Sequence, residues 1–139
     1  MANNKNQSSL TTAEIAYLQS QRLARIATVG PDGQPHVVPV SFRYNAGTKT
    51  IDIGGHDGFA KRKKWRDVKS NPKVAVVIDD IVSVNPWKVR GLEILGEAEM
   101  LMTGGQSIVP GFDPEMFRIK PKRAVSWGIN PETQTPITK

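Results

Sequence analysis

The chain has 139 residues, a net charge of +6 and no cysteine, so it suits a single domain and carries no disulfide, thiolate nucleophile or sulfur-based zinc site. Apolar residues make up 38% of the chain and charged residues 23%, which is typical of an ordinary globular protein. Twelve glycines and ten prolines indicate many turns and favour a mainly β fold.

The first ten residues are polar, are expected to be disordered, and lack the apolar core of a signal peptide. No later stretch approaches the roughly 20 apolar residues of a membrane span. We therefore expect a cytoplasmic protein without membrane contact. Thr11 and Glu14 form a capping box, which predicts a short helix at the start of a single domain over residues 11–130.

Three strands are expected next, over residues 23–29, 34–44 and 50–53. The first two flank the sequence Gly-Pro-Asp-Gly, a strong turn signal, and so form a hairpin. The third follows a break at residues 45–47 and ends at Gly54 and Gly55. Together the three strands predict an antiparallel meander.

Residues 58–70 are expected to form a helix that ends before Asn71 and Pro72, because proline disfavours helical geometry in the residue before it. The helix carries a basic run of Lys61, Arg62, Lys63, Lys64, Arg66 and Lys69. These six cations less the one anion Asp67 supply +5 of the net charge of +6. Such a local concentration favours one anion site over a nucleic-acid surface that is basic throughout.

The second half of the chain predicts further strands. Residues 73–79 and 89–102 are nearly continuous or alternating apolar runs, as expected of inner strands of a barrel. Residues 103–114 are rich in glycine and proline and predict a loop, and residues 118–127 predict the last strand. Residues 131–139 are expected to be a flexible tail.

The third strand and the basic helix together could bind an anion. Gly54 and Gly55 would let a ligand approach the backbone closely, and the start of the helix would supply amides and a favourable dipole. Arginine offers a planar fork to phosphate oxygens, and lysine a point charge. From the charge run alone, a solvated helix face is an equally good interpretation.

Five segments stand in a characteristic order: LARIATVGPDGQPHVVPVSFRY, IDIGGH, KRKKWRDVKSNPKVAVVIDD, NPWKVRGLEILGEAE and AVSWG. In this order and spacing they resemble the pyridoxamine 5'-phosphate oxidase-like split-barrel flavoproteins, especially a small bacterial branch that uses the deazaflavin coenzyme F420. The resemblance covers residues 13–128. It implies a mainly β fold with short α-helices, an antiparallel split β-barrel of the FMN-binding type. It also implies a homodimer in which both chains build each cofactor site.

The resemblance also implies site residues. In relatives the basic residues ahead of an Asn-Pro pair bind the cofactor's phosphate, which here implicates Arg62, Lys63 and Lys64. The second strand lines the ring system and its side chain, and the matching residues are Val38, Pro39, Val40 and Ser41. Ile53 and Gly54 match the opposite edge of the cofactor. From the residues alone, Val38 and Val40 fit equally well as core on one face of a strand.

Two tryptophans allow separate predictions. Trp87 follows Asn85 and Pro86 on a loop, where binding residues are frequent, and is a candidate wall of the site. Trp65 lies three residues before Val68 and is expected to pack inward. The only histidines, His36 and His56, make a poor metal-binding set without carboxylates, so no metal site is predicted.

No catalytic triad or carboxylate pair can be identified, which disfavours hydrolysis and agrees with hydride transfer by a cofactor. The predicted function is an F420-dependent oxidoreductase that passes hydride to a small unsaturated or quinone-like substrate, with FMN as the alternative cofactor. Solvent, Ser41 and Tyr44 remain open as proton sources.

Two other classes of function also stay open: a non-catalytic binder of flavin, deazaflavin or haem, and a nucleic-acid-binding domain that uses the basic helix. The chain lacks the arginine-rich C-terminal signature of the pyridoxamine phosphate oxidases, so we do not expect that reaction.

Overall fold

The computed structural model describes residues 2–5 and 9–129 of the chain. Its elements are β1 (Ala2–Lys5), α1 (Thr12–Gln19), β2 (Leu23–Val29), β3 (Pro35–Asn45), β4 (Thr50–Gly54), α2 (Lys63–Ser70), β5 (Lys73–Ser83), β6 (Lys88–Leu101) and β7 (Met116–Trp127). Two short 3-10 turns, η1 (Phe59–Lys61) and η2 (Gly105–Ser107), lie in the connections before α2 and before β7.

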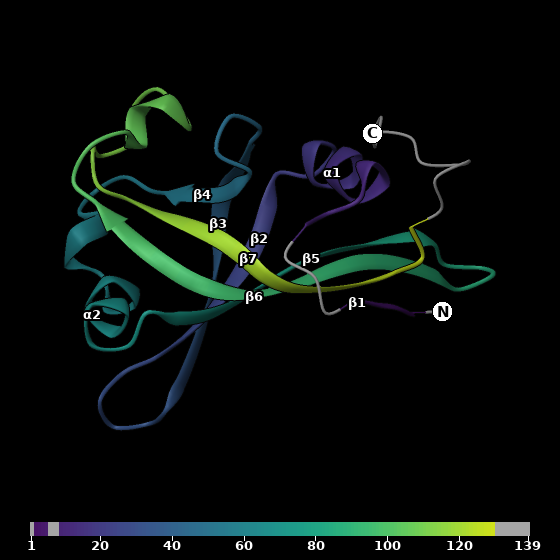
Figure 1. Cartoon of the computed structure of the whole chain (residues 1–139), viewed down its shortest axis with the longest axis horizontal. Coiled ribbons are helices and arrows are strands. Elements are labelled where there is room, and N and C mark those ends of the chain that lie inside the picture. The colour runs from purple at the N-terminus through teal and green to yellow at the C-terminus, as the bar shows by residue number, and fades with distance from the viewer. Residues whose placement is uncertain (1, 6–8, 130–139) are drawn as a thin grey trace.

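Six of the strands close into an antiparallel barrel (Figure 1). β7, β4, β3, β2, β5 and β6 are hydrogen-bonded in that order, and β6 pairs again with β7 to close the ring. Each of these pairings is antiparallel. The predicted antiparallel split barrel with short helices is therefore confirmed. Among the described helices, none is long and apolar enough to cross a membrane.

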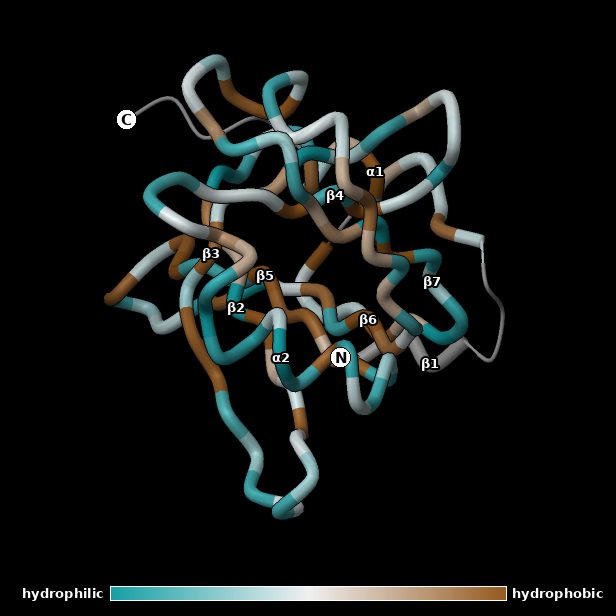
Figure 2. Tube along the Cα trace, turned by 90° about the vertical axis from the view of Figure 1, so that its left-hand side faces the viewer, coloured by the Kyte–Doolittle hydropathy of each residue, from teal (hydrophilic) through white to brown (hydrophobic). Residues whose placement is uncertain are grey.

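The core lies inside the barrel and beneath the helices. Along β2, Ala24, Ile26 and Thr28 are buried while Leu23 and Arg25 are exposed, which is the two-residue period of a strand with one face in a core. The largest fully buried side chains include Tyr17, Phe59, Phe117, Ile26, Ile94 and Ile119. By contrast, the turn between β2 and β3 projects from the barrel at the bottom of Figure 2 and is largely hydrophilic.

The predicted capping box starts α1. Thr11 Oγ1 accepts a hydrogen bond from the Glu14 amide at 3.1 Å, and Glu14 Oε1 accepts one from the Thr11 amide at 2.9 Å. Tyr17 then fastens α1 to the β5–β6 hairpin, because its hydroxyl donates to Asp80 Oδ1 at 2.7 Å and Arg90 Nε donates to the same oxygen at 2.9 Å. Burial raises the pKa of Tyr17 well above its usual value.

The N-terminal segment differs from the expected disorder at residues 2–5. These residues form β1, which pairs with residues 124–127 of β7, along an edge that β4 leaves free. Such pairing uses backbone groups, so a polar sequence gives little warning of it. Disorder was also expected at residues 1 and 6–8, which lie outside the described residues. Ser9 and Leu10 lie in an irregular segment before α1. The predicted flexible tail at 131–139 also lies outside the described residues.

Candidate functional site

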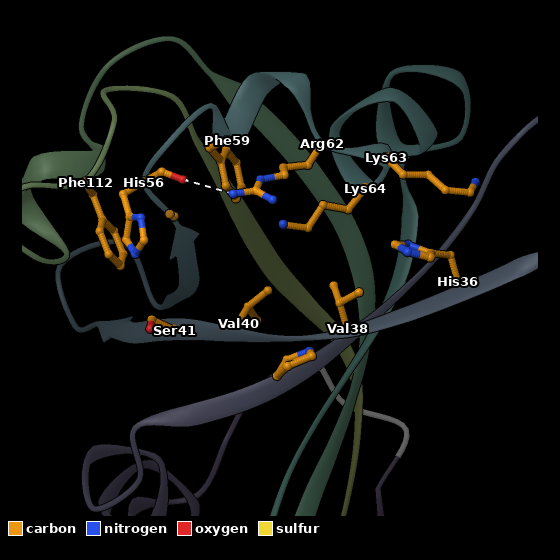
Figure 3. A pocket seen from close by; sticks show the side chains of 13 residues that line it. His36, Val38, Val40, Ser41, His56, Phe59, Arg62, Lys63, Lys64 and Phe112 are labelled. Atoms are coloured by element: carbon orange, nitrogen blue, oxygen red, sulfur yellow. Dashed lines mark hydrogen bonds between the residues drawn. The ribbon is translucent and has the colours of Figure 1, made fainter.

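A pocket of about 450 Å³ opens between β3, the segment from β4 to α2, and the segment between η2 and β7. Its size lies within the usual range for small-molecule sites. Its lining comprises His36, Val38, Pro39, Val40, Ser41, Gly54, Gly55, His56, Phe59, Arg62, Lys63, Lys64 and Phe112. Figure 3 shows Val38 and Val40 pointing from β3 towards Lys64, and Phe112 beside His56 at one end.

Of the ten residues predicted to bind the cofactor, eight line this pocket: Val38, Pro39, Val40, Ser41, Gly54, Arg62, Lys63 and Lys64. The pairing of β3 with β4 places Ser41 opposite Gly54. The short connection from β4 to α2 then brings the basic residues across from β3 (Figure 3). The fold thus joins the two parts of the chain that the resemblance assigned to one ligand.

The other two predicted residues lie elsewhere. Ile53 is fully buried and pairs with Phe42 on one side and Phe117 on the other, so its side chain belongs to the core. Trp87 is 63% exposed in the turn between β5 and β6, at the opposite end of the molecule from α2 (Figure 1). Because the two strands of this hairpin extend away from the pocket, Trp87 is not a wall of the pocket in its own chain.

The predicted helix over residues 58–70 is divided into two pieces. Gly58 has a left-handed φ of +94°, which favours glycine, and η1 follows it. Arg62 is extended, with φ −80° and ψ 157°, so α2 begins only at Lys63. In the described part of the chain no side chain caps this helix start. The amides of Lys63 and Lys64 are therefore available to an anion, whereas the Trp65 amide donates to the Arg62 carbonyl oxygen at 3.1 Å.

Lys63 is already neutralised by a carboxylate of its own helix. Its Nζ lies 2.9 Å and 3.2 Å from the two oxygens of Asp67, and the Thr28 hydroxyl donates to Asp67 Oδ2 at 2.8 Å. Burial alone would raise the pKa of Asp67, but the hydrogen bonds from Lys63 and Thr28 outweigh it and lower the pKa. Lys63 therefore holds Asp67 within α2, and Asp67 in turn links α2 to Thr28 of β2.

Among the described residues, Arg62 and Lys64 have no such partner. Arg62 Nη2 donates to the carbonyl oxygens of His56 and Asp57, both at 3.5 Å, and the first of these bonds is drawn in Figure 3. Within residues 2–5 and 9–129, no ion pair joins either cation to a carboxylate. Burial, and then the positive charge of Arg62, lower the pKa of Lys64. An anion bound by both side chains would relieve this repulsion.

An aromatic cluster packs under α2 and contacts Lys64. The Trp65 and Phe117 rings stack with centroids 5.5 Å apart, and the edge of Phe59 contacts both rings, with centroids at 5.7 Å and 5.0 Å. Lys64 Nζ in turn lies 5.0 Å from the centroid of the Phe59 ring. The predicted inward packing of Trp65 is thus confirmed. Because α2 has only eight residues, this packing, rather than helix propensity, holds it in place.

Phe112 and His56 form the end of the pocket, with ring centroids 6.1 Å apart. The reason for glycine at positions 54 and 55 differs from the one expected from the sequence. A Cβ atom at Gly54 would lie 3.0 Å from Phe112 Cδ2 and 3.2 Å from Ile108 Cδ1, and one at Gly55 would lie 3.0 Å from Phe59 Cδ1. Both glycines therefore make room for aromatic side chains of the protein itself.

Five lining residues were not among the ten predicted to bind the cofactor: His36, Gly55, His56, Phe59 and Phe112. Of these, Gly55 was expected, with Gly54, to let a ligand approach the backbone. His36 had a usable signal, because it shares the strand face of Val38 and Val40 at two-residue spacing. Phe112 had none, since it lies in an irregular segment whose path the sequence does not determine.

Comparisons with known proteins agree with this architecture. A family model described as pyridoxamine 5'-phosphate oxidase matches residues 10–127. A 5a,11a-dehydrotetracycline/5a,11a-dehydrooxytetracycline reductase from Streptomyces rimosus is 43% identical over 127 residues, which cover 91% of this chain and 89% of that protein.

Among solved structures, a conserved hypothetical protein from Mycobacterium tuberculosis has a TM-score of 0.68 at 21% identity, covering 99% of this chain and 96% of its own. A FAD-binding protein from Mesorhizobium loti has a TM-score of 0.65 at 19% identity, covering 91% and 95%. At these identities the two structures show a shared fold. The match of the family model and the identity to the reductase go further: the chain belongs to the pyridoxamine 5'-phosphate oxidase family.

Proposed function

We propose that this protein is an F420-dependent oxidoreductase that transfers hydride between the deazaflavin and a small unsaturated or quinone-like substrate, with FMN as the alternative cofactor. Identity of 43% to a reductase over 91% of the chain supports oxidoreductase chemistry. The name of that relative specifies reduction of a dehydro compound, which favours an unsaturated bond as the substrate here.

The observation that carries the proposal is a pair of cations, Arg62 and Lys64, at the start of α2, where the described residues provide neither a carboxylate partner nor a side-chain cap. Arg62 and Lys64 would hold the cofactor's phosphate together with the first amides of α2. Lys63 would act through Asp67, by keeping α2 against β2. This revises the predicted trio of cations into two ligand-binding residues and one structural residue.

The remaining walls fit a ring system. Val38 and Val40 present apolar side chains from β3, and Phe112 closes one end of the pocket (Figure 3). When bound, a reduced deazaflavin supplies the hydride. The chain's own part is to hold the phosphate, to orient the ring against β3, and to keep water from the apolar side. Ser41 is among the residues that line the pocket and Tyr44 is not, but Ser41 pairs with Leu23 and shares the outer face of the strand pair. Solvent and both hydroxyls therefore remain open as proton sources.

We further infer a homodimer, from the outer face of the barrel. Leu23 and Val37 are 64% and 62% exposed, and they lie on the same side of the β2–β3 pair, where Ala27 is opposite Val37. An apolar groove of about 580 Å³ beside them is lined in part by Ala27 and Leu95. Exposed apolar side chains beside such a groove are typical of an interface, although the charged Arg25 lies between Leu23 and Ala27 on this face.

Two aspartate substitutions on this face, L23D and V37D, test the dimer. Light scattering should find two chains per particle for the natural protein and one for the double variant, and a monomeric natural protein would refute the dimer. In the dimer, any contact of Trp87 with a cofactor is with the one bound by the second copy, because Trp87 lies outside the pocket of its own chain.

A fluorescence titration with F420 and, separately, with FMN tests the function. The double variant R62A/K64A should bind at least about tenfold more weakly, since charge-assisted contacts worth about 1.4 kcal/mol are lost. The control K61A/K69A removes the same charge from exposed positions outside the pocket and should bind like the natural protein. Binding of neither cofactor, or equal loss in both variants, would refute the proposal.

A further inference from the structure

One carboxylate outside the pocket lining connects two of its walls. Asp113 Oδ2 accepts hydrogen bonds from the amides of Gly58 and Phe59 at 2.9 Å and 2.8 Å. These two amides begin η1, so Asp113 caps that turn from a segment more than fifty residues away in the sequence. Hydrogen bonds from these two amides lower the pKa of Asp113 and keep it charged at neutral pH.

The backbone of Asp113 adds a second link in the opposite direction. Its amide donates to the carbonyl oxygen of Gly55 at 2.8 Å. The turn from Gly55 to Phe59 is thus held at both ends by one residue. Further bonds fix the segment that carries Asp113, since Gly105 donates to Pro114 O at 2.9 Å and Arg43 Nη1 donates to Ser107 O.

The turn needs such support because its backbone is unusual. Asp57 and Gly58 are consecutive residues with positive φ, at 59° and 94°, and a non-glycine residue in this region carries a cost that surrounding structure must offset. The carboxylate of Asp113 accepts from two amides that η1 itself leaves without acceptors. Arg62 follows directly after η1.

We propose that Asp113 is a positioning residue for the phosphate site: by holding the Gly58–Phe59 turn, it sets the place of Arg62 and of the first turn of α2. This inference rests on the proposed function, in which Arg62 and Lys64 bind a phosphate. On this inference, Asp113 contributes to the preference of the protein for a phosphorylated ligand over the same ring system without phosphate.

The test compares two matched ligand pairs. One pair is FMN and riboflavin, and the other is F420 and its deazaflavin precursor that ends at the ribityl hydroxyl. Dissociation constants are measured by ligand fluorescence for the natural protein, for D113A and D113N, and for the control E99Q. Glu99 is an exposed carboxylate of β6 that lines neither this pocket nor the apolar groove. Circular dichroism establishes whether each variant is folded. If D113A is not folded, the test uses D113N alone.

The natural protein should prefer the phosphorylated member of at least one pair by about tenfold or more. D113A should lower this preference by about fivefold or more, D113N should lower it less because its amide oxygen can still accept, and E99Q should leave it unchanged. An equal loss of affinity for both members, with the preference retained, would mean that Asp113 is merely structural and would overturn the inference. A natural protein without any preference for phosphate would contradict the proposed function itself.

Discussion

Exchanging Lys63 and Lys64 for methionine, one at a time, removes the same charge from adjacent positions, but the two variants should behave in opposite ways. Lys63 pairs with Asp67, whose side chain is 3% exposed. K63M leaves that carboxylate with Thr28 as its remaining side-chain partner. Lys64 has no carboxylate partner among the described residues, so K64M leaves no charge behind.

The size of the effect follows from burial. Removing one partner of a fully buried ion pair costs about 3–5 kcal/mol. The side chain of Lys63 is 40% exposed, so water screens the pair, and we expect K63M to lower the free energy of unfolding by about 1–2 kcal/mol at neutral pH. K64M loses mainly the contact with the Phe59 ring and should stay within about 0.5 kcal/mol of the natural protein.

The pH dependence gives the sign of each effect. The pKa of Asp67 is lowered in the folded protein, so its contribution to stability is present above the usual pKa of an aspartate and is lost as the pH falls through the lowered value. The difference between K63M and the natural protein should therefore shrink in acid. The pKa of Lys64 is also lowered, so charging Lys64 favours the unfolded state and its removal does not weaken the fold.

Urea unfolding followed by tryptophan fluorescence measures the free energies, and cofactor titration measures the affinities. K63M should be less stable while keeping cofactor affinity within about threefold, and K64M should keep its stability while binding about tenfold more weakly. If K63M loses affinity as strongly as K64M and both remain stable, then Lys63 is a phosphate ligand and the assignment of roles is wrong.

Three further changes test other parts of the site. G54A places a Cβ against Phe112 and Ile108, so it should displace the Phe112 ring and weaken cofactor binding. It should also lower the free energy of unfolding in urea by about 1 kcal/mol. An unchanged cofactor affinity would remove Phe112 from the site. W65A removes a ring stacked on Phe117 and should cost about 3–5 kcal/mol by circular dichroism in urea, and a loss under about 1 kcal/mol would show that the cluster does not anchor α2. Because the pKa of Lys64 is lowered, cofactor affinity should fall as the pH rises through that value in the natural protein but not in K64R, and identical pH profiles would exclude Lys64.

Much of the barrel could be predicted because strand signals are local. Alternating apolar residues and the turn at residues 30–33 place β2 and β3 within a residue or two of their observed bounds. The capping box of Thr11 and Glu14 likewise marks the start of α1. The closure of the barrel by pairing of β6 with β7 follows from the resemblance to a family and not from any local pattern.

The site was harder to predict because its geometry depends on tertiary contacts and on backbone conformation. The break before α2 depends on positive φ at Asp57 and Gly58, and Asp113 supports it from a distant segment. A charge run predicts cations but not their partners, so the ion pair between Lys63 and Asp67, although four residues apart, was not distinguished from a free lysine. Trp87 was placed on a loop correctly, but the length of β5 and β6 carries that loop away from the pocket.

The central claim is tested most directly by hydride transfer under anaerobic conditions. Reduced F420 is mixed with the protein and an unsaturated or quinone-like acceptor, and the absorbance of the oxidised deazaflavin is followed over time. We predict that oxidised F420 appears only when both protein and acceptor are present, in one equivalent per acceptor reduced, and much more slowly with R62A/K64A. If reduced F420 stays unoxidised while reduced FMN supports reduction of the same acceptors, the claim for F420 is contradicted.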